Sequence, residues 1–132
     1  MKFPIFIDLK DKPVLIVGGG KIGGRRAKIL KDFGADVTVI DPLFGLKREF
    51  SDEDIKDKFL VLACTDNSKL NAHIAKICRE RNIFVSRADS AEDSTFFFPA
   101  LCESMDICVG LVSSGDKHTL VKETAEKIRR IL

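Results

Sequence analysis

The chain has 132 residues, a length that suits one domain of ordinary size. With 45% apolar and 32% charged residues, its composition excludes disorder over most of the length, and the formal net charge of +2 argues against a nucleic-acid binder. No apolar run approaches the roughly 20 residues of a membrane helix, and the polar start lacks a secretory signal. We therefore expect a cytoplasmic protein with no nucleic-acid or membrane partner.

Short β-branched or apolar runs alternate with longer amphipathic segments along the chain. They predict strands at residues 14–17, 37–40, 46–50, 59–63, 83–85, 96–98 and 107–112. They predict helices between the glycine cluster and Gly34, over 67–81 and over 119–132, with a short acidic helix or turn at 51–58. This alternation is typical of an α/β fold, and we expect one domain over residues 1–132: a doubly wound, Rossmann-type parallel sheet with helices on both faces. Ligands of such sheets bind at the carboxyl ends of the strands.

The first predicted strand runs directly into three glycines. Gly18, Gly20 and Gly23 match the pattern G-x-G-x-x-G, which is weak alone but here follows a buried strand and opens a helix. In such a turn the first glycine permits a tight bend, the second lets the backbone approach a pyrophosphate, and the third lets helix and strand pack closely. Amides at the helix start then meet the phosphate charge. Because no Lys-Ser or Lys-Thr pair completes a P-loop, the pattern predicts a dinucleotide site.

Asp41 ends the second predicted strand, 23 positions after Gly18. There a carboxylate accepts both hydroxyls of an adenine ribose and repels a 2′-phosphate, so NAD is favoured over NADP. The alternative is an ordinary Asp-Pro turn at the strand end. The residues that we expect to bind NAD are Gly18, Gly20, Lys21, Ile22, Gly23, Asp41, Pro42, Leu43, Thr65 and Asp66.

The four cysteines and two histidines show no zinc-like spacing. We expect free thiols, buried or half-buried, and no bound metal.

The order of motifs across nearly the whole chain resembles precorrin-2 dehydrogenase, the N-terminal module of siroheme synthases. The matching stretches are PIFIDL (4–9), VLIVGGGKIGGRRA (14–27), GADVTVIDP (34–42), FLVLACTDNSKLN (59–71), FVSRADSAEDSTFFFPA (84–100) and SSG (113–115). The resemblance implies NAD-dependent oxidation of precorrin-2, a tetrapyrrole with many carboxylates, to sirohydrochlorin in siroheme biosynthesis. Some members also insert ferrous iron, and since the ring nitrogens bind the metal, a missing ligand cluster does not argue against it.

The resemblance also implies a catalytic residue. The segment SRAD at 86–89 matches an N-V-V-D-type segment whose aspartate is the family's acid–base residue, which indicates Asp89. Oxidation removes a hydride and a proton, so an oriented carboxylate near the ring has a task as proton acceptor. The alternative is a turn residue in Ala-Asp-Ser.

Substrate carboxylates need cations and polar groups near the mouth of the site. By resemblance we expect Arg25, Ser114 and Gly115 to bind substrate, with Arg26, Arg87, Lys117 and His118 as further cations. The alternatives are a solvated helix face for Arg25 and Arg26 and a simple cap and loop for the serines. The segment departs from the family pattern S-x-G-G-x-S-P-x-L-A, and Asp116 would repel a polyanion.

The chain ends one predicted helix after the SSG segment, so we expect the family's dimerisation segment to be largely absent. The apolar stripe of that helix either covers the domain's own sheet or pairs with a second copy, and a two-fold homodimer is the simplest arrangement. Two other functions remain open. One is a non-catalytic NAD-binding regulatory module, which leaves FFFPA and the Asp89 segment unexplained. The other is a degenerate family member that has lost the ring substrate.

Overall fold

The computed structural model describes all of residues 1–132. Contacts divide the chain into two compact units, residues 8–96 and residues 1–7 with 97–132. That residues 1–132 form a single domain remains a prediction. No helix combines the length and the apolar character that a membrane crossing requires.

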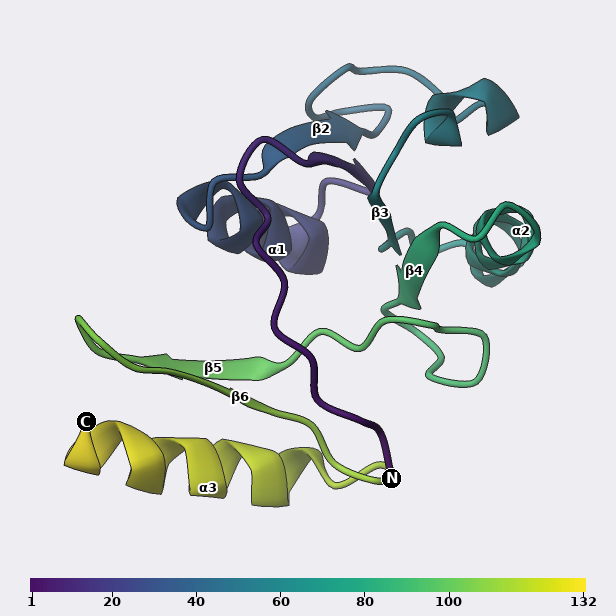
Figure 1. The fold of residues 1–132 in the computed structure, drawn as a ribbon. Helices are drawn as coiled ribbons and strands as arrows, with labels where there is room; N and C mark the ends of the chain where they lie inside the picture. Colours follow the sequence, from purple (N-terminus) through teal and green to yellow (C-terminus); the bar gives the residue numbers. More distant parts are fainter. The chain divides into compact units, whose positions relative to one another are not determined.

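Residues 8–96 form a four-stranded parallel sheet with helices, which confirms the predicted fold class (Figure 1). The elements in chain order are β1 Pro13–Val17, α1 Lys21–Asp32, β2 Asp36–Ile40, the 3₁₀ helix η1 Asp52–Ile55, β3 Leu60–Ala63, α2 Ser68–Glu80 and β4 Phe84–Arg87. The strands lie in the order β2-β1-β3-β4. After β2 the chain therefore crosses over β1 to β3, so β2 and β3 lie on opposite sides of β1. The order of strands reverses between β1 and β3, and this is the topological switch point of a doubly wound sheet.

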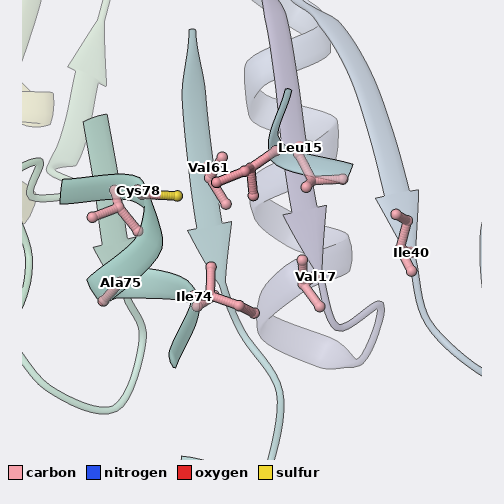
Figure 2. Close-up of a cluster of buried hydrophobic side chains, with 10 residues drawn as sticks. Leu15, Val17, Ile40, Val61, Ile74, Ala75 and Cys78 are labelled. Atoms are coloured by element: carbon pink, nitrogen blue, oxygen red, sulfur yellow. The ribbon is translucent and has the colours of Figure 1, made fainter. Parts of the chain in front are cut away.

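The two faces of the sheet are covered by different helices. Alternate residues of a strand point to opposite faces, and the whole of β3 is buried, as two covered faces require. Leu15, Val17 and Val61 pack with α2 and η1 in one cluster of buried side chains (Figure 2). The residues between them in the strands, such as Ile16 and Leu62, point to the other face of the sheet and are equally buried. Helix α1 has its own buried residues, which face the sheet. Figure 1 shows α1 and α2 on opposite sides of the sheet.

The connection after β2 differs from the prediction of a strand at 46–50. The chain turns back along the free edge of β2, where Leu46 N–H donates to the Val39 carbonyl and Gly45 forms a single bridge with Ile40. After this bridge Arg48 binds Asp54 of η1 through two nitrogens, at 2.9 and 2.7 Å. The predicted short acidic helix or turn at 51–58 is confirmed as η1, with Ser51 and Asp54 forming a capping box.

Residues 97–132 contain β5 Ala100–Glu103, β6 Cys108–Leu111 and α3 His118–Ile131. β5 and β6 pair antiparallel in a separate two-stranded sheet, so the strand predicted at 96–98 is wrong and that at 107–112 does not join the parallel sheet. α3 packs against β5. Ala125 of α3 is buried beside Cys102, whereas Leu120 and Ile131 of the predicted stripe are exposed. A homodimer through this stripe stays a prediction.

All four cysteines are free, as expected, and three of them are buried or half-buried. Cys108 is exposed, which corrects the expectation for that thiol. Burial raises the pKa of Cys78 to about 12, so this thiol is uncharged at neutral pH.

Candidate functional site

The glycine turn between β1 and α1 leaves no room for side chains at two of its three pattern positions. Gly18 has a φ of +100°, and a Cβ there would lie 2.5 Å from the Cys64 carbonyl oxygen. A Cβ on Gly23 would lie 1.8 Å from the Gly18 carbonyl oxygen. The first glycine therefore makes the bend beside the end of β3, and the third lets α1 press onto the turn, as the sequence pattern predicts.

The second glycine of the pattern has a different environment. A Cβ on Gly20 would meet no atom within 4 Å, so the space above the turn is open at this point. Gly20 is also the N-cap of α1, and no side chain caps the helix. The first amides of α1, including those of Lys21 and Ile22, are therefore not used by a capping side chain and fit a diphosphate group.

Asp41 lies at the carboxyl end of β2 and binds the glycine turn directly. One carboxylate oxygen accepts a hydrogen bond from Gly19 N–H at 2.8 Å, and the other accepts one from Leu43 N–H at 2.8 Å. These amides, that of Gly19 foremost, lower the pKa of Asp41. A carboxylate has about four lone-pair sites, and because the Phe44 amide contributes a third, weaker hydrogen bond, one site remains for a ribose hydroxyl. Pro42 and Leu43 follow as an exposed loop.

Thr65, at the end of β3, is held by a buried asparagine of α2. The Asn71 side chain is fully buried; its oxygen accepts from the Thr65 hydroxyl at 2.6 Å and amide at 3.2 Å, and its nitrogen donates to the Thr65 carbonyl at 2.9 Å. Sequence reasoning assigned Asn71 no role, although a polar residue on the apolar stripe of α2 is the signal that marks it. The predicted neighbour Asp66 is exposed.

Asp89 follows β4 in a loop that returns along the free edge of that strand. The hydroxyls of Ser94 and Thr95 accept hydrogen bonds from the amides of Arg87 and Val85, which fixes the loop to the edge. The Asp89 carboxylate binds the Arg87 guanidinium through both oxygens, at 2.9 and 3.0 Å. Arg87 first, and then Asn71, lowers the pKa of Asp89, while burial acts in the opposite direction. Asp89 is thus ionised at neutral pH.

The two neighbouring arginines of α1 have different environments. Arg25 is exposed, whereas Arg26 is half-buried and lies close enough to Cys64 to lower the pKa of that thiol, against the larger effect of burial. Since the charge of Asp89 also acts on Cys64, the end of β3 brings Arg26 and Asp89 into one neighbourhood. Arg25 as a substrate ligand stays a prediction.

The remaining predicted substrate residues belong to the other unit. Ser114 and Gly115 lie between β6 and α3, where the Gly115 carbonyl accepts hydrogen bonds from the Ser113 hydroxyl and the Lys117 amide. Lys2 donates to the Ser113 carbonyl at 3.4 Å. Asp116 and His118 are exposed. The roles of Ser114 and Gly115 stay predictions.

The glycine turn, the open space above Gly20, Asp41 and Thr65 thus meet at the carboxyl ends of β1, β2 and β3, at the switch point of the sheet. This arrangement defines a dinucleotide-binding domain of the α/β class. Residues 5–100 match the family model NAD_binding_7, described as "Putative NAD(P)-binding". The chain belongs to this family, and NAD(P) as cofactor is thereby confirmed.

Curated relatives carry related names. The chain is 42% identical over 145 residues to the "Probable multifunctional siroheme biosynthesis protein HemA" of Ruminiclostridium josui, a match that covers 98% of this chain and 28% of that protein. It is 32% identical over 143 residues to "Siroheme synthase 1" of Pectobacterium atrosepticum and 33% identical over 141 residues to "Siroheme synthase" of Tolumonas auensis. Each of these two matches covers 98% of this chain and 30% of the relative, so the chain spans less than a third of the proteins it matches.

Among solved structures, the chain is similar to "SirC, precorrin-2 dehydrogenase", with a TM-score of 0.82 and 23% identity. The match covers 99% of this chain and 71% of that one, and it shows that the two share a fold.

The position of Asp41 leads to a prediction about cofactor choice. Replacing Asp41 with alanine should weaken NAD⁺ binding roughly 10- to 100-fold, because hydrogen bonds to a charged group contribute about 1.5–3 kcal/mol. The variant should also bind NADP⁺ and NAD⁺ more equally, since the repulsion of a 2′-phosphate is lost. Calorimetric titration with both nucleotides measures these changes. Asp36→Asn, at the exposed start of the same strand, is the matched control.

The lowered pKa of Asp41 fixes the pH dependence of this binding. The carboxylate stays charged as the pH falls toward the ordinary aspartate value of 3.8, so NAD⁺ affinity should hold through the mildly acidic range and fail only below that value. Equal affinities for Asp41→Ala and the unaltered protein would remove Asp41 from the site.

Proposed function

We propose that this chain is an NAD-dependent precorrin-2 dehydrogenase module, which oxidises precorrin-2 to sirohydrochlorin in siroheme biosynthesis. The observation that supports this function most directly is the position of Asp89, an ionised carboxylate hydrogen-bonded to the same asparagine that holds Thr65 beside the glycine turn. The family supplies the cofactor class, and the names of the relatives supply the pathway.

The oxidation removes two electrons and two protons from the tetrapyrrole. A bound NAD⁺ would supply the hydride acceptor, and the hydride would carry both electrons and one proton. The second proton leaves the ring system and goes to the Asp89 carboxylate. Because loss of hydride leaves the ring system cationic, the second proton is acidic, and a carboxylate of lowered pKa is a sufficient acceptor. Water then carries this proton away.

The chain's other residues in this proposal bind and orient. The turn amides and the open space above Gly20 accommodate the diphosphate, and Asp41 holds the adenine ribose. Arg48 does not serve a 2′-phosphate, since both its terminal nitrogens bind Asp54, and this supports NAD over NADP. Arg25, Ser114 and Gly115 are proposed to bind substrate carboxylates. Iron insertion remains part of the proposal as a separate activity, to be measured with ferrous iron and sirohydrochlorin.

The test is turnover of precorrin-2 with NAD⁺, followed by the absorbance of sirohydrochlorin. Asp89→Asn should lower kcat by roughly 10²- to 10⁴-fold, the usual effect of removing an acid–base group, with NAD⁺ affinity unchanged. Asp52→Asn is a matched control, because Asp52 is an exposed aspartate that pairs only with His73 at 2.8 Å.

Two outcomes would contradict the proposal. Full turnover by Asp89→Asn would show that another group takes the proton. NAD⁺ binding by the unaltered protein without any turnover of precorrin-2 would favour a non-catalytic NAD-binding module.

A further inference from the structure

Arg87 lies at the last position of β4, and its guanidinium is almost completely occupied by partners in its own neighbourhood. Its side chain is only 8% exposed. Two nitrogens bind the two oxygens of Asp89, at 2.9 and 3.0 Å, and a third binds Asp93 at 2.5 Å. The Ser68 hydroxyl, at the start of α2, lies 3.4 Å from the guanidinium. These bonds use four of the five N–H donors of the guanidinium, so the side chain is committed mainly to its own loop and to α2.

The planar fork of an arginine fixes a carboxylate in two directions at once. Two parallel N–H···O bonds define both the position and the plane of the bound carboxylate, which a single point charge cannot do. The guanidinium is fixed in turn, since Asp93 holds its third nitrogen and the Arg87 amide donates to Ser94 at 2.9 Å. The loop that carries Asp89 is thus attached to the end of the sheet through one side chain.

We propose that Arg87 is a positioning residue that holds the Asp89 carboxylate in a single orientation at the carboxyl end of the sheet. The inference deepens the proposed function and rests on it, because orientation matters only if Asp89 receives the proton. In SRAD at 86–89, Arg87 stands two positions before Asp89, at the last position of β4.

The charges around Asp89 decide how it titrates. Arg87 faces it from β4, and Asp93 shares the same guanidinium from the loop. Arg79 of α2 lies 3.9 Å from Asp93. Asn71 of α2 is neutral, and the Cys64 thiol at the end of β3, with Arg26 beside it, completes the surroundings. Removing the Arg87 charge takes the nearest cation from Asp89 and leaves it near Asp93, whose remaining cation is Arg79 at 3.9 Å. Both changes favour the protonated form of Asp89.

Arg87→Gln tests the inference in the full chain. We expect the pKa of Asp89, followed by carboxyl carbon NMR, to move upward, and the acidic limb of the turnover profile to move upward with it. At the pH optimum kcat should fall roughly 10- to 100-fold with little change in the KM for NAD⁺, because a misplaced group loses about this much. Arg87→Lys should keep the positive charge but lose the pair of parallel hydrogen bonds to Asp89. It should therefore restore the pKa of Asp89 more fully than kcat.

Arg79→Gln is the matched control, since it removes a positive charge from Asp93 without touching Asp89. It should leave both the Asp89 titration and kcat close to those of the unaltered protein. An Asp89 titration that is the same in Arg87→Gln and in the unaltered protein would overturn the inference. This outcome is separate from a failure of the proposed function, which shows as full turnover by Asp89→Asn whatever the titration does.

Discussion

Alanine at Gly23 is expected to abolish cofactor binding and to lower the free energy of unfolding by about 3 kcal/mol or more. The new Cβ would lie 1.8 Å from the Gly18 carbonyl oxygen, a backbone atom in a turn that is itself pressed against Cys64. Overpacking in well-packed regions costs about 1–3 kcal/mol and more where neighbours cannot move. α1 must therefore tilt away from the turn, which removes its first amides from the diphosphate position. Urea denaturation and NAD⁺ titration measure the two effects.

Two other glycines provide controls for this prediction. Gly24 lies next in α1, and a Cβ there comes no closer than 3.8 Å to the Gly19 carbonyl oxygen. Gly24→Ala should stabilise the protein by up to about 1 kcal/mol through helix propensity, with NAD⁺ affinity retained. Gly20→Ala should leave stability nearly unchanged and weaken NAD⁺ binding, because its Cβ enters the open space above the turn. Equal stability of Gly23→Ala and Gly24→Ala would contradict the steric argument.

Local patterns predicted the parts of the site that lie within one β-α-β unit. The run at 14–17, the three glycines and Asp41 are close in sequence, and each has its own conformational requirement, so their arrangement follows from order and spacing. The same reasoning failed for 96–98. These phenylalanines suggested a strand, but Phe96 N–H donates to the Val85 carbonyl of β4, and Pro99 has no amide to donate. Strand β5 begins only at Ala100.

The parts of the site that depend on how a loop folds back or which strands pair could not be predicted. Arg87 was expected among the cations for substrate carboxylates. Its partners are only two and six positions further along the chain, but spacing alone does not show that the loop brings their carboxylates to the guanidinium. Its guanidinium instead binds Asp89 and Asp93, because the loop after β4 folds back along the strand edge. The pairing of β5 with β6 in a separate sheet could not be predicted either, because a short apolar run can form a strand in either sheet.

Asn71 contacts both Thr65, which follows β3, and Asp89, which follows β4. It is the second position where we expect a large effect. Asn71→Ala should lower the free energy of unfolding by about 2–4 kcal/mol, because the Thr65 amide and carbonyl lose their partner and a buried unsatisfied polar group costs about 1–3 kcal/mol. Asp89 loses a donor in the same step, so its pKa should rise and kcat should fall. Urea denaturation and turnover of precorrin-2 test both results.

Asn67→Ala separates the loss of this network from a general weakening of α2. Asn67 is the N-cap of the helix, and its side chain accepts from Leu70 N–H at 3.1 Å. Its removal should cost about 1 kcal/mol, as N-caps do, and should leave the Asp89 titration unchanged. If the two variants lost the same stability and the same turnover, Asn71 would be an ordinary helix residue. If Asn71→Ala alone raised the pKa of Asp89, the buried asparagine would be the link through which the cofactor end of β3 and the proton acceptor after β4 are held together.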